Sequence, residues 1–334
     1  MKPILLSVAL LAPTLGFAEK VDVTVANLVR AESDHMIRAN MAAFGFGVAE
    51  LFHLRQPTTT DNQPVIRMNQ DTLYSAIVLD LSQPVQITLP EIGDRYQSML
   101  VVSQDHYMLS YAKPGTYELT SDNVGTDFAF VAFRTFVDVT DPEDIAATHA
   151  AQDAIQVSGG GSGPFVAPDW DTDQLDMARK AMNDLSSLGF DATRAFGTRD
   201  EVDPIDYFVG AIAAWGGLPP NAAIYIIDAV AANDGTTPHS VTLQEVPVDA
   251  FWSITVYNAE GYLEANDLSV NSYNNYTAQP DANGAIEINF GGCDDGRPNC
   301  LPITPGWNFT TRLYEPHDAL LDGSWAFPDV VPVN

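Results

Sequence analysis

The order of helix-like and strand-like segments is the feature that most constrains this fold. Apolar residues at helical spacing fill residues 23–55, and we expect the segment around Gly45 and Gly47 to break or bend this helix. Two runs of segments rich in β-branched and aromatic residues follow, at 85–137 and 223–314, and helical patterns fill most of 140–220 between them. Proline, glycine and Asp-Asn pairs punctuate the strands, which is typical of antiparallel sheets. The pattern predicts an α+β protein with two β-rich, antiparallel, sandwich- or barrel-like domains, an N-terminal helix and a bridging helical segment.

Breaks in this pattern give the expected domain boundaries. We expect a signal peptide at 1–18, an N-terminal α+β domain at 19–157, a helical linker region at 158–220 and a C-terminal β domain at 221–334. The glycine run at 159–163 is interpreted as a flexible break. A phosphate cradle is not favoured there, because no strand precedes the run and no Lys-Ser/Thr pair follows it. Helices are predicted at 140–155, 172–188 and 203–214, and strands at 85–89, 97–103, 115–119, 128–137, 223–227, 240–243, 251–257, 285–290 and 308–314.

The first residues have the pattern of an export signal. Lys2 is followed by an almost wholly apolar stretch at 4–15, and Gly16 and Ala18 are the small residues that a signal peptidase recognises. The apolar stretch is too short to span a bilayer. We therefore expect cleavage after Ala18 and a soluble protein in the periplasm or outside the cell.

The charge balance excludes several classes of partner. The chain has 44 acidic and 15 basic residues, a formal net charge of −29 at pH 7. Such a field repels nucleic-acid phosphates and anionic lipid headgroups. We therefore expect neither nucleic acid nor a membrane as partner, and favour a small-molecule or carbohydrate ligand. The sequence does not indicate the oligomeric state.

Cys293 and Cys300 are the two cysteines of the chain, and Gly296 and Pro298 between them favour a chain reversal. In an exported protein such a pair is most simply a disulfide. A zinc site is disfavoured because two thiolates alone are too few ligands and no histidine lies nearby in the sequence.

The densest group of polar residues lies at 67–74, just before an apolar strand-like segment. A functional interpretation makes Asp71 a base or a metal ligand, Arg67 a clamp for a carboxylate, and Asn69 and Tyr74 groups that orient a substrate. The alternative is a buried turn whose side chains bond the local backbone, with Arg67 paired to Asp71. The sequence leaves both open.

Other candidates lie outside this motif. His106 follows Asp105 at the end of a strand-like segment, so it could be a general base, a metal ligand or a hydrogen-bonded structural residue; the last is favoured. Arg312 lies on a predicted strand and is expected to pair with an acid such as Asp71 or Asp322, which would join the domains. Tyr273 and Tyr276 lie in an irregular polar stretch and are candidates for ligand recognition.

Several enzyme signatures are absent from the sequence. It has no His-Glu-x-x-His zinc motif, no Gly-x-Ser-x-Gly nucleophile turn and no dinucleotide-binding fingerprint. No metal site is predicted.

A set of motifs lies at 27–34, 52–55, 67–74, 105–107, 215–219, 248–257, 300–307, 312–316 and 321–325. Together they resemble the bacterial family in which domain of unknown function 1254 precedes domain of unknown function 1214. The likeness covers nearly all of the chain after the signal peptide. It implies two β-rich domains with helices and often export, and it implies no cofactor and no established mechanism.

Three functional hypotheses follow. The first is a small-molecule enzyme, a metal-independent hydrolase with its site between the two β-domains, in which Asp71 or His106 acts as base and Arg67 or Arg312 stabilises an anion. The second is a non-catalytic module that binds a carbohydrate or another polymer through Tyr273 and Tyr276. The third is a structural envelope protein whose polar motifs hold the domains together.

Overall fold

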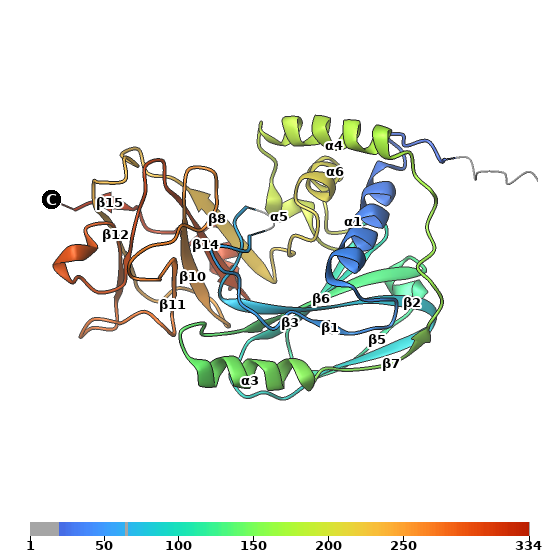
Figure 1. The fold of residues 1–334 in the computed structure, drawn as a ribbon, viewed down its shortest axis with the longest axis horizontal. Helices are drawn as coiled ribbons and strands as arrows, with labels where there is room; N and C mark the ends of the chain where they lie inside the picture. The colour runs from blue at the N-terminus through green and yellow to red at the C-terminus, as the bar shows by residue number, and fades with distance from the viewer. Residues whose placement is uncertain (1–19, 64–65, 334) are drawn as a thin grey trace, which may run out of the picture.

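A computed structural model describes residues 20–63 and 66–333, and it confirms the α+β class. Figure 1 shows a C-terminal β-sandwich beside a larger N-terminal half, in which a sheet lies between helices on both faces. The predicted signal peptide lies outside the described residues. Within them, no helix is long and apolar enough to cross a bilayer.

The N-terminal half is built on a seven-stranded sheet with the order β1-β2-β6-β3-β4, and β5 and β7 also pair with β2. The 18-residue strand β2 bends between Asp80 and Val85, so its first part pairs with β6 and its second part with β5 and β7. The strands are β1 (Phe52–His53), β2 (Thr72–Leu89), β3 (Gln97–Ser103), β4 (Met108–Tyr111), β5 (Gly115–Leu119), β6 (Phe128–Phe136) and β7 (Gln156–Gly161).

Helices cover both faces of this sheet. In Figure 1, α1, α4 and α6 lie on one side and α3 lies on the other. Aspartate N-caps followed by proline begin α3 and α6, at Asp141 and Asp203. The helices are α1 (Leu28–Phe44), α2 (Ser121–Val124), α3 (Pro142–Asp153), α4 (Thr172–Ser186), α5 (Ala192–Ala195), α6 (Pro204–Ala213) and α7 (Asp318–Leu321).

The first helix ends just before Gly45, within the segment where a break or bend is predicted. Gly45 adopts the left-handed conformation (φ 71°), and its N–H bonds the carbonyl of Met41, which ends α1 at Phe44. Phe52 then belongs to the short strand β1 and not to a helix.

The expectation of a flexible break at 159–163 was wrong, because residues 159–161 lie within β7. The glycines allow a close approach between strands. A Cβ at position 159 would lie 2.3 Å from the carbonyl oxygen of Pro84, and one at 161 would lie 2.0 Å from the carboxylate of Asp80. The pairing of β7 with β2 therefore requires residues without side chains at these positions, and it does not require flexibility.

The C-terminal half is a sandwich of two four-stranded sheets, β11-β10-β14-β8 and β13-β12-β9-β15. Apolar side chains from both sheets, including Ile254, Phe290 and Trp307, form its core. The strands are β8 (Ala223–Asp228), β9 (His239–Leu243), β10 (Trp252–Tyr257), β11 (Ser272–Asn274), β12 (Ile286–Phe290), β13 (Cys300–Leu301), β14 (Asn308–Tyr314) and β15 (Val331–Pro332).

The outer face of the first of these sheets turns toward the N-terminal half. Phe309 and Leu313 of β14 point into the sandwich core, so the alternate residues Thr310 and Arg312 point outward. Tyr314, also on this outward face, belongs to a core cluster that includes strands of both halves. The two β-domains therefore share one continuous core, and polar residues extend across the rest of their contact.

Candidate functional site

The docking segment, residues 67–72, lies against the outer face of β14 and β10. Arg67 has a positive φ of 56°. Its Nη1 donates to Asn308 Oδ1 at 2.8 Å and to Thr310 Oγ1 at 3.3 Å, and its backbone N–H donates to the carbonyl of Gly261 at 2.8 Å. The unusual backbone conformation is thus held by contacts with the other domain.

Asn69 and Asp71 continue this contact. Asn69 Nδ2 donates to the hydroxyl of Tyr314 at 2.8 Å. The buried carboxylate of Asp71 accepts from Asn274 Nδ2 at 3.1 Å and from the hydroxyl of Ser272 at 3.3 Å. Asp71 is therefore bonded to neutral groups of β11 and does not pair with Arg67.

Arg312 joins the domains, but not through an acid. Its side chain donates to Thr255 Oγ1 at 2.9 Å, to the hydroxyl of Tyr257 at 2.7 Å and to the backbone carbonyl of Arg67 at 2.9 Å. No carboxylate of the described residues lies within 4 Å of its guanidinium, so the predicted partners Asp71 and Asp322 are wrong. Neutral acceptors satisfy Arg312 instead, and the side chain is only 3% exposed.

Three arginines at this interface share the absence of an acidic partner. Neither Arg67, Arg134 nor Arg312 has a described carboxylate within 4 Å, although the chain has 44 acidic residues. Such a group is unusual in so acidic a chain, and it makes the interface locally cationic. The basic residues that do form ion pairs are Arg30, Arg55, Arg95, Lys113, Arg179, Lys180, Arg194 and Arg297.

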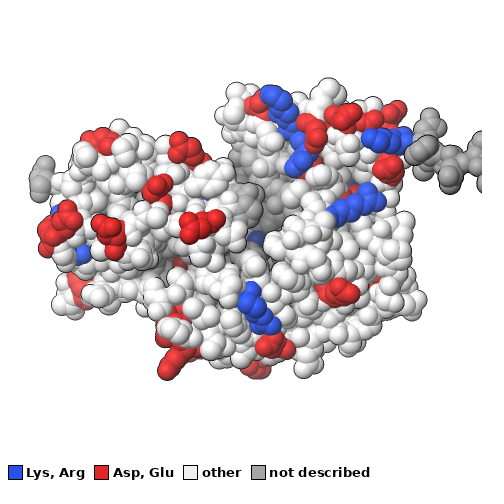
Figure 2. Space-filling model, in the orientation of Figure 1, with Lys and Arg blue, Asp and Glu red and all other residues white. Residues whose placement is uncertain are grey.

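Arg134 lies in the middle of the N-terminal sheet, where part of the sheet face is accessible. Tyr74 on β2 is opposite Arg134 on β6, and Ala76 is opposite Ala132 in the next row. All four side chains are only partly buried, whereas Val78 and Phe136 on the same face are buried. We call the space above these four residues the interdomain hollow. On the face of the molecule that Figure 2 draws, acidic side chains outnumber basic ones.

Tyrosines surround the guanidinium of Arg134. The guanidinium carbon lies 5.5 Å from the ring centre of Tyr74, and Nη1 is buried without a hydrogen-bond partner within the described chain. Burial raises the pKa of Tyr225, and the positive charges of Arg134 and Arg312 lower it. Tyr225 lies next to Arg312 in the sheet register and is nevertheless 37% exposed. It therefore forms a wall of the interdomain hollow on the C-terminal side.

His106 lies away from this group. His106 follows the C-terminal end of β3, whereas Ser98, the neighbour of Arg134, is near the start of that strand. His106 has a φ of 60°, and its ring packs against Phe196 and Trp215. Its Nε2 accepts the N–H of Gly216 at 3.0 Å, and burial lowers the pKa of His106 to about 3. The imidazole is neutral at pH 7 and is fully enclosed.

Tyr273 and Tyr276 do not form one aromatic platform. Tyr273 packs against the sandwich core. Tyr276 is 53% exposed, and its ring centre lies 4.8 Å from that of Phe136 across the domain contact. The predicted site residues thus divide. Arg67, Asn69, Asp71 and Arg312 lie together, Tyr74 lies beside Arg134, and His106, Tyr273 and Tyr276 lie elsewhere.

Sequence reasoning missed Arg134, Tyr225 and the two alanines. Arg134 had a detectable signal, because it is the one charged residue in the strand-like run 128–137. A charge within such an apolar run needs either a partner or a function.

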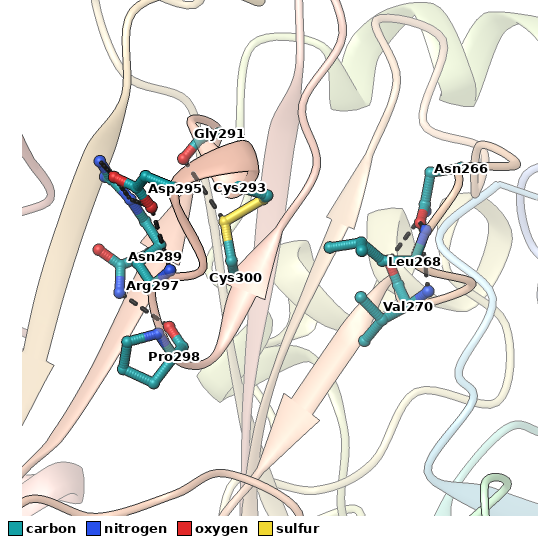
Figure 3. The surroundings of a disulfide bond; sticks show 10 residues. All are labelled: Asn266, Leu268, Val270, Asn289, Gly291, Cys293, Asp295, Arg297, Pro298 and Cys300. Atoms are coloured by element: carbon teal, nitrogen blue, oxygen red, sulfur yellow. Dashed lines mark hydrogen bonds and ion pairs between the residues drawn. A yellow bond between two sulfur atoms is a disulfide. The ribbon is translucent and has the colours of Figure 1, made fainter.

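The predicted disulfide between Cys293 and Cys300 is present, with a Cα–Cα distance of 5.6 Å. Figure 3 shows that it closes the turn in which Arg297 pairs with Asp295. It stabilises the edge of the sandwich near β13, away from the docking segment.

Two other hollows are less suited to a charged ligand. A groove of about 570 Å³ runs along β2 and β7, and no basic residue lines it. A hollow of about 180 Å³ is lined by Arg199, but also by Asp105 and Asp122, which offset its charge. Among the described residues, no three His, Cys, Asp or Glu side chains are grouped to hold a metal ion.

Two family models match the chain. Protein of unknown function (DUF1254) matches residues 48–159, and Protein of unknown function (DUF1214) matches residues 223–318. No curated protein is a significant match.

Among solved structures, the VPA0106 protein from Vibrio parahaemolyticus is similar with a TM-score of 0.70 and 18% identity, over 93% of this chain and 98% of that one. An uncharacterized protein from Burkholderia cenocepacia has a TM-score of 0.45 and 16% identity, over 92% of this chain and 86% of that one. The Vibrio structure supports the fold, and neither likeness assigns a ligand.

Proposed function

We propose that this chain, which belongs to the family that joins a DUF1254 domain to a DUF1214 domain, binds a small carboxylate in the interdomain hollow. The observation that carries the proposal is Arg134. Its guanidinium lies in a partly accessible part of a sheet centre, no described acid lies within 4 Å, and Nη1 has no hydrogen-bond partner in the described chain.

A carboxylate would complete the interactions of Arg134. Guanidinium and carboxylate form two parallel charge-assisted hydrogen bonds, and these are stronger where water is partly excluded. A partly buried cation without a counter-charge is unfavourable by itself, so an incoming anion would remove that penalty on binding.

The surrounding tyrosines support an anionic ligand. Burial raises the pKa of Tyr225, so its phenol keeps its proton at neutral pH and can donate a hydrogen bond. Tyr74 brings a second phenol ring to Arg134. Neutral phenols beside a guanidinium favour an oxyanion over a cation.

The proposal concerns binding, and it leaves the hydrolase hypothesis as a prediction. The bases of that hypothesis were Asp71 and His106. The carboxylate of Asp71 is bonded to Asn274 and Ser272, and His106 is enclosed among aromatic rings at another part of the sheet. A reaction would need a base beside Arg134, and these two do not supply it.

The test is calorimetric titration of the folded protein with acetate, benzoate, phenylacetate, citrate and glucuronate. We expect at least one of them to bind with a dissociation constant in the millimolar range or tighter, and Arg134→Gln to weaken it at least tenfold. Arg199→Gln is the matched control, since Arg199 is exposed, stacks over Tyr107 and also has no described acid within 4 Å.

The result can contradict the proposal in two ways. Binding that survives Arg134→Gln at full strength would place the site elsewhere. No heat with any of the five carboxylates would also reject it. Equal loss in both arginine variants would indicate a general charge effect and not a site.

Export belongs to the same proposal. Residues 1–18 would be removed, and the disulfide is compatible with an oxidising compartment. Mass spectrometry of the protein from a periplasmic fraction should give a chain that begins at Glu19. A full-length chain found only in the cytoplasm would contradict this.

A further inference from the structure

The rows of the sheet beneath the interdomain hollow change from polar to apolar along the strands. The first row contains Tyr74, Arg134 and Ser98. The next contains Phe52, Ala76, Ala132 and Leu100, one from each of four neighbouring strands. Residues paired in register point to the same side of a sheet, so this second row lies beside the guanidinium.

The small residues of the second row make room above the sheet. Ala132 is on β6, which has strands on both sides, and a domain and helices cover this face. An alanine in such a position is normally buried, yet both Ala132 and Ala76 remain partly accessible. The sheet face is therefore not fully covered by larger side chains at these two residues.

Aromatic residues bound this apolar floor. Phe52 is opposite Ala76 on the edge strand β1. Phe130 is two residues before Ala132 on β6, and its ring packs against Trp215 with 5.5 Å between the ring centres. Arg134 and Phe130 are four positions apart on one strand, so their Cα atoms are separated by roughly 13 Å. A six-membered ring with a carboxylate fits within that length.

We infer that the ligand is a carboxylate with a compact apolar body, such as an aryl or branched acyl carboxylate; this rests on the proposed function of Arg134. The carboxylate lies on Arg134, with Tyr74 and Tyr225 beside it. The body lies on Ala76 and Ala132, between Phe52 and the Phe130–Trp215 pair. Sugar acids are disfavoured, because their hydroxyl groups would lose water against alanine and phenylalanine.

The ligand series tests this directly. Titration of the wild-type protein with acetate, benzoate and glucuronate separates charge from apolar area. We expect benzoate to bind at least tenfold more tightly than acetate, because burying its ring removes apolar surface from water. Glucuronate should bind no more tightly than acetate. Glucuronate binding as tight as benzoate, or equal binding of acetate and benzoate, would overturn the inference.

Variants of the floor provide a second test. Ala132→Leu would occupy the space above the sheet, so benzoate should bind at least tenfold more weakly and acetate within about threefold of wild type. Ala76→Val is the second variant, to be used if Ala132→Leu does not fold. Ala181→Leu, on the exposed face of α4, is the control and should leave both affinities unchanged.

The two proposals fail in different ways. If acetate and benzoate bind equally and both require Arg134, the carboxylate site stands and the apolar body is rejected. If neither requires Arg134, the site itself is rejected. Unchanged benzoate binding in a folded Ala132→Leu protein would also reject the placement of the body on the floor.

Discussion

Arg312 and Arg134 lie on the two sheets that face each other across the domain contact, and neither has an acidic partner within the described chain. Arg312 is 3% exposed and donates to three neutral acceptors, on Thr255, Tyr257 and Arg67. Arg134 is partly accessible, and its Nη1 donates to none. The same residue type thus makes three hydrogen bonds on one side of the interface, whereas on the other side it leaves a buried donor without a partner.

This difference distinguishes two kinds of arginine. Arg312 holds the two domains together, and we call it the framework arginine; Arg134 is proposed to bind the ligand, and we call it the site arginine. A guanidinium whose donors are satisfied by its own chain has little capacity left for a ligand, whereas one with free donors in a hollow can take one. Charge alone would not have distinguished the two arginines. The number of donors already used distinguishes them. Substitutions of Arg312 and Arg134 test this difference, and substitutions of Glu32 and Asp71 compare it with two buried acids.

The largest effect is expected at the framework arginine. Arg312→Met removes a buried guanidinium and leaves the hydroxyl groups of Thr255 and Tyr257 and the carbonyl of Arg67 without their donor. We expect the free energy of unfolding to fall by about 3–5 kcal/mol. Urea denaturation measures it. A loss below about 1 kcal/mol would show that Arg312 is not a framework residue.

A buried acid lies elsewhere in the N-terminal half, at Glu32 of α1. Glu32 is 1% exposed, and its carboxylate lies 3.0 Å from Arg179 Nε. Burial raises the pKa of Glu32 to about 7, and Arg179 opposes the rise. Because the folded-state pKa lies above the unfolded value, the contribution of Glu32 to stability is complete below pH 4.5 and is lost as pH rises through 7.

Glu32→Gln should therefore stabilise the protein at pH 8, by about 2–3 kcal/mol, and have little effect at pH 4. Unfolding curves at both pH values measure the difference. Equal effects at the two pH values would mean that Glu32 does not titrate in this range. A loss of stability at pH 8 would mean that the ion pair with Arg179 outweighs burial.

Asp71→Asn tests the docking segment on the N-terminal side. The substitution keeps one acceptor for Asn274 or Ser272 but replaces the other oxygen with a donor. We expect a loss of about 1–2 kcal/mol in the free energy of unfolding, with carboxylate binding unchanged. Loss of binding with unchanged stability would instead restore the catalytic interpretation of Asp71.

The smallest change in stability is expected at the site arginine. Arg134→Gln should alter the free energy of unfolding of the unliganded protein by less than about 1 kcal/mol, because no hydrogen bond of Nη1 is lost. It should reduce the stabilisation by benzoate from about 2.7 kcal/mol, at a hundred times the wild-type dissociation constant, to about 1.4 kcal/mol or less. A loss comparable to that of Arg312→Met would make Arg134 a framework residue as well.

The fold was more predictable from sequence than the site. Strands such as 97–103 and 115–119 were predicted with their observed bounds, because alternation and turn residues are local signals. The family with its two domains in order was confirmed. The glycine run of β7 was misinterpreted, since its reason is the nearness of Pro84 and Asp80, which only the folded sheet reveals.

The candidate site depended on contacts that sequence does not encode locally. Residues 67–74 were recognised as important, but their role in docking rests on partners some 240 positions later, such as Asn308 and Tyr314. Ala132 gives no signal in the sequence, because an alanine is informative only once its accessibility in the sheet centre is known.

The shared aromatic core has a consequence for the order in which the chain is made. Phe136 and Tyr96 belong to the first domain, and their covers, Phe251 and Tyr314, leave the ribosome more than a hundred residues later. At typical rates of protein synthesis this delay is on the order of ten seconds. Until the second half of the chain is present, the first domain has rings that nothing else in the molecule can shield.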